Sequence, residues 1–274
     1  ATLIEVFNEL QILKQPCINQ RFLVFRDFNA RITEFSDLVM RSLDEIRSKL
    51  KTCDDKSLYT LYADLTYWRW AVEFLINYNL DETTFSQNMN SASAIVKDVI
   101  GAIAARVEKP LKAIDEDLKR LSCNPVTADV IKKSTELHTK HLVSLTTMNV
   151  PSIKEQVVLD LISKYLQLYH GAIGALVEAR VKVLEAMYDQ LHGNLEKTQG
   201  VDALKQLLVQ NKRIFDQECE IHSALTALCN VHNYQALESY NDKVDKMKRC
   251  RQEIEYKIED IARSTARNNL QGVI

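Results

Sequence analysis

Two Cys–His pairs lie close together in the C-terminal part of the chain. Cys219 precedes His222 by three positions, and Cys229 precedes His232 by the same spacing. Thiolate and imidazole are ligands that zinc prefers, so the residue types are those of a zinc site. On one continuous helix, however, the ten residues from one pair to the next span about 15 Å, and zinc–ligand distances are roughly 2 Å. A zinc site would need the helix to break at residues 224–227, so we expect these pairs to be structural.

Other common site patterns are absent from the sequence. Asp54 and Asp55 lack a third carboxylate at helical spacing, which magnesium-dependent diphosphate chemistry requires. No Glu-x-x-His pair and no glycine-rich phosphate loop occurs. Four histidines have no metal-ligand spacing to any cysteine or carboxylate: His138, His141, His170 and His192. We therefore predict a protein that is not an enzyme and holds no cofactor or metal, the alternative being an enzyme with an unrecognised site.

Basic residues gather between Arg106 and His141, where eight Lys or Arg stand against six acids, a net charge of +2. An anionic membrane surface attracts each nearby basic residue by about 1 kcal/mol, so this segment binds lipid only if its acids point away. The acids at 115–117 span most of a helix circumference, and the alternative is a solvated surface of mixed charge. The candidate lipid-binding residues are Lys109, Lys112, Lys119, Arg120, Lys132, Lys133 and Lys140.

Composition predicts an all-α fold. The chain has 274 residues, 46% hydrophobic and 26% charged, but only 6 Gly and 4 Pro, too few turn residues for many short strands. The net charge of -2 gives no reason to expect nucleic acid as a partner. No apolar run approaches the roughly 18 residues of a membrane-spanning helix, and we expect no leader peptide. The six scattered cysteines predict reduced thiols in a cytoplasmic protein.

The N-terminal half predicts three helical segments. Residues 1–15 form a short amphipathic helix whose acidic polar face favours packing on the protein over lipid insertion. Residues 21–51 form a long helix with apolar residues every three or four positions. Asp54 or Asp55 can cap the next helix, which runs from about 57 to about 121. Its first aromatic residues predict core or subunit contact, and residues 77–91 predict a fray, kink or short loop.

A turn at Pro125, capped by Thr127, starts a third long helix that we expect to run to Asn194. Gly171 and Gly174 lie on its seam side, which predicts close packing beside a bulky neighbour. Gly193 and Gly200 predict the next break. The expected inward seam of this helix consists of Ile153, Val157, Leu161, Tyr165, Leu168, Ala172, Ala175, Ala179, Val183 and Met187.

The C-terminal part predicts a helical hairpin or coiled coil. A fourth helix covers 201–232, and a last one carries apolar residues at alternating spacings of three and four from Leu237 to Ile261, with only Arg251 out of character. Residues 268–274 have lost the pattern. We therefore divide the chain into a helical bundle at 1–200 and a C-terminal hairpin at 201–274.

Two prolines leave the path of the long helices open. Pro110 and Pro151 each remove a backbone hydrogen bond, so both helices can bend together and curve the pair. The alternative is that one or both prolines end a helix, which gives a compact bundle of shorter rods.

Two stretches carry a resemblance to a known family. The segment from Val107 to Lys119, with its Pro-Leu pair before an acidic and basic run, resembles the second helix of BAR domains. Residues 142–176, with Glu-Gln-Val at 155–157 and Tyr-His-Gly-Ala at 169–172, are similar to the third helix of endophilin-like members. The resemblance covers about 21–195, and 201–274 add two helices beyond the usual third.

The resemblance implies an antiparallel, crescent-shaped homodimer that senses or stabilises curved membranes through basic residues. We therefore expect a non-enzymatic scaffold in membrane trafficking, cytoplasmic and peripheral to an anionic membrane. Residues 201–274 then serve as an accessory element or bind a protein partner. The alternative is a helical adaptor or tether that receives an amphipathic helix from another protein without touching lipid.

Overall fold

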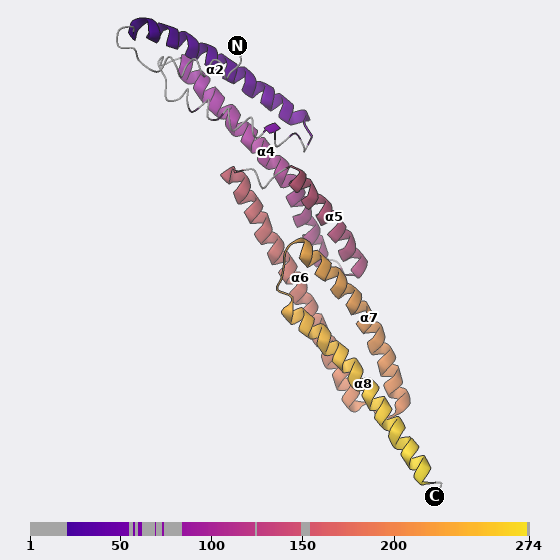
Figure 1. Ribbon diagram of the computed structural model, residues 1–274. Coiled ribbons are helices and arrows are strands. Elements are labelled where there is room, and N and C mark those ends of the chain that lie inside the picture. The colour runs from indigo at the N-terminus through magenta and orange to yellow at the C-terminus, as the bar shows by residue number, and fades with distance from the viewer. Residues whose placement is uncertain are drawn as a thin grey trace. The chain divides into compact units, whose positions relative to one another are not determined.

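A computed structural model describes residues 21–54, 57, 60–61, 69, 73, 84–123, 125–148 and 154–272, without the side chains of 21–32 and 84–89. The described residues form six helices and no strand, which confirms the predicted all-α fold (Figure 1). The predicted helix at 1–15, the aromatic residues from Tyr59 to Tyr78 and the isoleucine at 153 lie outside them.

Two compact units divide the chain. The first comprises Ala1–Pro110 and Val143–Ile162, and the second comprises Leu111–Leu142 and Ser163–Ile274. The predicted domain boundary at residue 200 does not fall at an edge of either unit, and it stays a prediction.

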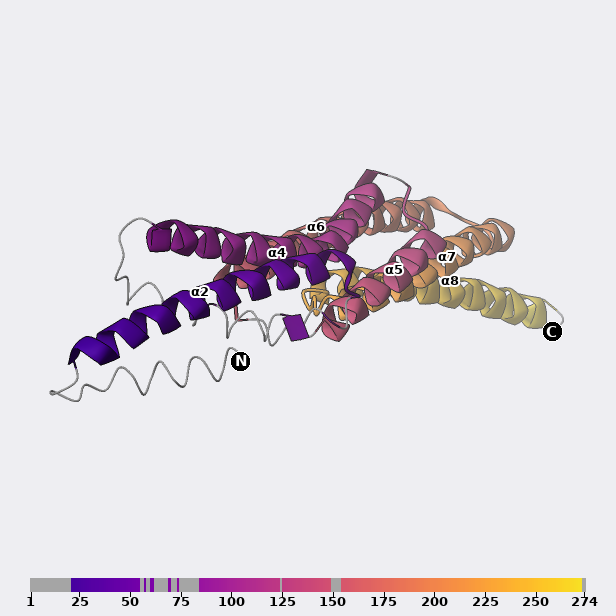
Figure 2. The same cartoon turned by 90° about the horizontal axis from the view of Figure 1, so that it is seen from above.

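In the first unit, α2 (Arg21–Thr52) lies beside the first part of α4 (Thr84–Cys123) (Figure 2). The described part of the α2 apolar stripe is buried as predicted, because one face of the helix is apolar throughout: Phe35, Val39, Leu43, Ile46 and Leu50. After α2, Asp54 Oδ1 accepts bonds from the backbone N–H of Ser57 at 2.9 Å and from its hydroxyl at 2.6 Å, which confirms the predicted cap.

Pro110 lies inside α4, so the helix does not end there. Of the stretch 77–91, where we expected a fray, kink or short loop, residues from Thr84 onward are helical and α4 begins there, while 77–83 lie outside the described residues. The buried residues Ala92, Ile95, Val96 and Val99 follow this polar stretch at helical spacing, and their burial outweighs the weak helix propensity of Asn and Ser.

The third helix, predicted as continuous from 127 to 194, is two helices. α5 (Ala128–Thr147) ends before Pro151, and α6 (Gln156–Lys197) begins after it. A proline cannot donate the backbone bond that the preceding turn needs, which favours a helix end nearby. Pro151 itself lies outside the described residues. α6 also runs through Gly193, so the break predicted there is wrong.

The predicted seam of α6 is displaced by about one residue. Val158 is fully buried and Val157 is 58% exposed, while Leu168 and Val183 are also exposed. Apolar residues occupy several faces of α6, so periodicity alone does not select one of them. The buried positions are Val158, Tyr165, Tyr169, Ile173, Leu176, Val177, Leu184, Leu191 and Leu195, of which only Tyr165 belongs to the predicted seam.

In the second unit, α7 (Val201–Val231) and α8 (Glu238–Gln271) form the predicted hairpin (Figure 1). Gly200 precedes α7 with a φ of 101°, a conformation that favours glycine, and confirms the predicted break there. The α8 seam is confirmed at Tyr240, Met247 and Ile254, with Cys250 added. The helix also includes residues 268–271, where we had expected the pattern to end.

Candidate functional site

The candidate site is the hairpin made by the C-terminal part of α4, from Leu111, and by α5 up to Leu142, all in the second unit. We call it the α4–α5 hairpin. α4 ends at Cys123 and α5 begins at Ala128. Thr127 Oγ1 accepts the backbone N–H of Val130 at 3.3 Å, which confirms the predicted cap after Pro125. The acid Asp129 in the first turn of α5 also favours the helix start.

All seven predicted lipid-binding side chains are exposed. Lys109 lies in the first unit, and the other six lie on the α4–α5 hairpin. On each helix of the hairpin the basic residues fall within a third of the circumference, because their spacings of one, seven and eight residues return to one face. Two acids share the stripe of α5, Asp129 and Glu136, and one shares the stripe of α4, Glu116.

The other two acids of the hairpin turn into the protein. Asp115 is 7% exposed, and its carboxylate accepts a bond from Lys119 Nζ at 2.6 Å. This bond and the charge of Asp115 raise the pKa of Lys119, which therefore stays protonated. The side chain of Asp117 is 15% exposed and faces α5. The exposed surface of the hairpin thus carries six basic side chains against three acidic ones.

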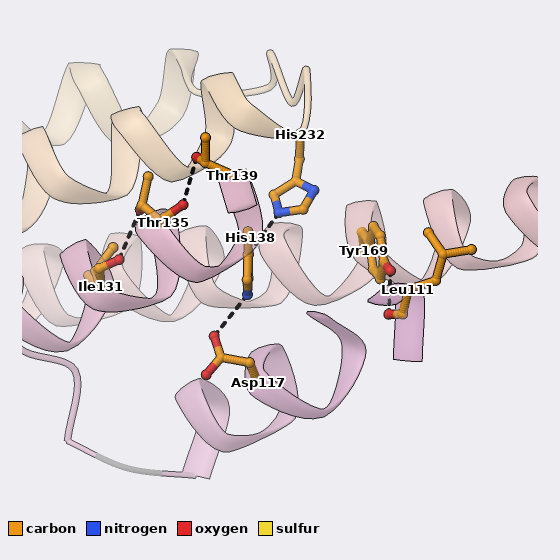
Figure 3. Close-up of polar contacts among 8 residues, drawn as sticks. All are labelled: Leu111, Asp117, Ile131, Thr135, His138, Thr139, Tyr169 and His232. Carbon is orange, nitrogen blue, oxygen red and sulfur yellow. Dashed lines mark hydrogen bonds and ion pairs between the residues drawn. The ribbon is translucent and has the colours of Figure 1, made fainter. Parts of the chain in front are cut away.

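Asp117 belongs to a buried chain of hydrogen bonds that we call the His138 network (Figure 3). Its Oδ2 lies 2.8 Å from His138 Nε2, and His138 Nδ1 lies 2.9 Å from His232 Nε2. A carboxylate only accepts, so His138 carries its proton on Nε2 and accepts at Nδ1 from the N–H of His232. The network joins α4, α5 and the residue that caps α7.

Two further contacts tie α6 to the same place. His170 Nε2 donates to the carbonyl oxygen of His232 at 2.9 Å. The hydroxyl of Tyr169 donates to the carbonyl oxygen of Leu111, one residue after Pro110 (Figure 3). The ring of Tyr169 also packs edge-on against His232, with centroids 5.3 Å apart. The hairpin is therefore fixed to α6 and α7 mainly by three side chains that are almost fully buried, Tyr169, His138 and His232, whereas His170 is exposed.

Burial determines the charge of this network. Desolvation lowers the pKa of His138 against the opposing effect of Asp117, and desolvation with the neighbouring His138 and His170 lowers the pKa of His232 to about 4. Both rings are neutral at neutral pH. Burial likewise raises the pKa of Tyr169, so its hydroxyl remains a donor.

The arrangement is suited to holding the hairpin in place. Both nitrogens of His138 are engaged, one by Asp117 and one by His232, so His138 has no free atom for a substrate proton. Sequence reasoning considered these histidines only as metal ligands and missed their pairing. A signal was present, because His138 lies at helical spacing from the buried positions Ile131 and Leu145.

The two Cys–His pairs are separated as expected. α7 is unbroken from Val201 to Val231, so the helix end that a shared zinc site requires at 224–227 does not occur. His222 Nε2 lies 2.7 Å from Asn241 Oδ1, and Cys229 is buried. In the described part of the chain, no cluster of three or more His, Cys, Asp or Glu has the arrangement of a metal site. The five described cysteines are free thiols.

Comparisons with known proteins give no match: no family model, curated protein or solved structure is similar to this chain. The BAR resemblance therefore stays a prediction. None of the helices described here has the length and apolarity needed to cross a membrane.

Proposed function

We propose that the protein is a non-enzymatic scaffold that binds anionic membrane surfaces peripherally through the α4–α5 hairpin. The observation that supports this best is the inward turn of Asp117, whose carboxylate contacts His138 and no described basic residue of the hairpin surface. Asp115 is buried too, but it pairs with Lys119 and offsets that one charge. Five of the six exposed basic side chains, all except Lys119, can approach a phosphate head group as point charges that are unpaired within the described part of the chain, each worth about 1 kcal/mol near the surface.

The finer form of the proposal follows the BAR resemblance. Two copies of the chain pair in antiparallel fashion into a crescent that senses or stabilises curvature in membrane trafficking, in the cytoplasm. Residues 201–274 then serve as an accessory or partner-binding element. A small-angle scattering profile tests this form, because an elongated dimer and a compact monomer differ greatly in maximum dimension.

Sedimentation with phosphatidylserine-containing vesicles tests the membrane role. We expect the protein to pellet at low salt and to be released at high salt. The double variant Lys132→Glu, Lys133→Glu should bind at least about 30-fold more weakly, the equivalent of losing two attractions of ~1 kcal/mol. The matched control is Lys212→Glu, Arg213→Glu, an adjacent exposed basic pair on α7. Equal weakening by both variants would contradict a role for the hairpin.

The second candidate function is the adaptor, and the displaced seam of α6 favours it. Leu168, Ala175, Ala179 and Val183 are exposed and recur at spacings of seven, four and four, which places them on one stripe. Such a stripe suits the apolar face of an amphipathic helix from a partner protein. A protein that dimerises but does not pellet with vesicles at any salt concentration would support this candidate over the first.

A further inference from the structure

A pocket of about 480 Å³ lies between α2 and α4 in the first unit. Its wall contains four cations: Arg47 and Lys51 from α2, and Lys97 and Arg106 from α4. Asp98 is the one carboxylate among the lining residues. The volume falls in the range of small-ligand sites, about 300 to 1,000 Å³.

Two of the cations are held in the wall by contacts of their own. Arg106 reaches the end of α2, where its guanidinium donates to the carbonyl oxygens of Leu50, at 3.4 Å, and of Cys53. Carbonyl groups at a helix C-terminus lack intrahelical partners, so a cation is stable there. Arg47 Nη2 lies 3.1 Å from Asp98 Oδ2, a contact exposed to solvent on both sides.

The other two cations keep their full charge available. Lys51 and Lys97 are exposed, and neither forms an ion pair with another described residue. Since Asp98 offsets only one of the four positive charges, the pocket carries a net charge of about +3. Cations gathered in a concave surface repel one another, and a bound anion relieves that repulsion.

Gly101 is one of the residues that line the pocket. A Cβ placed on Gly101 would meet no atom within 4 Å. Glycine inside a helix costs roughly 1 kcal/mol relative to alanine, so α4 would be more stable with a side chain here. The glycine leaves the wall of the pocket without a side chain at this position.

We propose that this pocket binds a compact molecule with two or more phosphate groups. Lys51 and Lys97 supply mobile ammonium charges, and Arg47 supplies a guanidinium that can bind a phosphate with two bonds. The proposal is independent of the membrane role of the α4–α5 hairpin. The same chemistry fits a soluble polyphosphorylated metabolite or the head group of a polyphosphoinositide.

Isothermal titration of the full chain with inositol hexakisphosphate tests the proposal. We expect saturable binding at one site that weakens with salt. The variant Lys51→Glu, Lys97→Glu should bind at least about tenfold more weakly. The control Arg41→Glu, Lys49→Glu makes the same charge change at exposed positions of α2 outside the pocket. The variant Gly101→Phe fills the pocket and keeps every charge, and it should also lose binding.

A second experiment distinguishes a soluble phosphorylated ligand from a lipid head group, and some results would contradict the proposed site. Phosphatidylcholine vesicles with phosphatidylinositol bisphosphate are compared with the same vesicles carrying phosphatidylserine. Binding of the bisphosphate vesicles that Gly101→Phe abolishes assigns a lipid head group, and binding of inositol hexakisphosphate alone assigns a soluble ligand. Absence of saturable binding to the native chain overturns the proposal, as does retention of full affinity by Gly101→Phe.

Discussion

Two regions of the second unit each place a histidine against a carboxylate, and they differ in nearly everything else. At the α4–α5 hairpin, His138 is fully buried and lies 2.8 Å from Asp117. Near the end of α6, His192 lies 3.6 Å from Glu196, with side chains 39% and 70% exposed. The first pair belongs to a network that joins three helices, and the second lies within one helix turn.

The difference shows that solvent access decides what such a pair does. At the surface, water replaces either partner at small cost, and exposed pairs contribute roughly 0 to 1 kcal/mol. In the interior, removing one partner leaves the other polar group without a hydrogen bond and without water to replace it. The free energy of each group in a buried network therefore depends on the other groups being present. We therefore expect the hairpin to be positioned by the His138 network, and the His192 pair to be dispensable.

The largest effect should come from removing His138. His138→Ala leaves the carboxylate of Asp117 and the N–H of His232 without their partners and opens a cavity, so we expect a loss of about 3 kcal/mol in the free energy of unfolding. Urea denaturation followed by circular dichroism measures it. The matched variant His192→Ala should cost less than about 1 kcal/mol.

Vesicle binding extends the same test to function. If the network holds the hairpin, His138→Ala should also change the vesicle binding of the folded protein, while His192→Ala should not. Equal unfolding free energies for the two variants would contradict the distinction between the regions.

The next effect is a dependence of stability on pH. The pKa of His232 is about 4 in the folded protein and 6.5 when unperturbed, so between these values the unfolded chain binds a proton that the folded chain excludes. Stability should therefore fall as pH decreases from 6.5 to 4 and change no further from this group below that range. The expected loss is about 3 kcal/mol, from a shift of about 2.5 pKa units at 1.36 kcal/mol per unit.

Unfolding free energies measured between pH 6.5 and pH 4 test whether stability falls as the pH decreases. His232→Gln removes this titrating ring and should reduce the slope of the curve, leaving the part that His138 contributes, since the pKa of His138 is lowered as well. A native curve that is level or rises toward acid would show that the folded network accepts the proton.

Local patterns predicted those parts of the fold whose apolar residues occupy a single face. The stripe from Phe35 to Leu50 has one apolar face, and it is buried as predicted. On α6 the adjacent residues Val157 and Val158 are both apolar, so only the neighbouring helices decide which one is buried. The same limit applies to Pro110 and Pro151, because tertiary packing decides whether a helix continues past a proline.

The basic surface was predictable residue by residue, but its net charge was not. The sequence shows Asp117 as a charge that offsets the lysines, but its carboxylate turns to His138, 21 positions away, whereas Asp115 does pair with Lys119 within the same helix. His138 and His232 are 94 positions apart, and no local spacing links them. Local spacing does not predict the proposed phosphate-binding pocket either, because its lining residues come from two helices: Lys51 lies on α2 and Lys97 on α4.

The smallest predicted effect is on the stability of variants at two glycines of α6. It tests whether the side chains around His232 are closely packed as well as hydrogen-bonded. A Cβ at Gly174 would lie 3.2 Å from the hydroxyl of Tyr234, whose ring packs against His170, while a Cβ at Gly171 would meet nothing within 4 Å. This confirms the expected bulky neighbour for Gly174 and shows that the expectation was wrong for Gly171.

Gly171→Ala should therefore stabilise the protein by up to about 1 kcal/mol, because alanine favours the helix. Gly174→Ala gains the same helix propensity but must displace Tyr234, so it should be less stable than Gly171→Ala by about 1 kcal/mol. Thermal unfolding of the two variants side by side measures the difference. The double variant Gly174→Ala, Tyr234→Phe removes the hydroxyl and should recover most of the gap. If it does not, the crowding at this site arises from the ring of Tyr234 and its contact with His170.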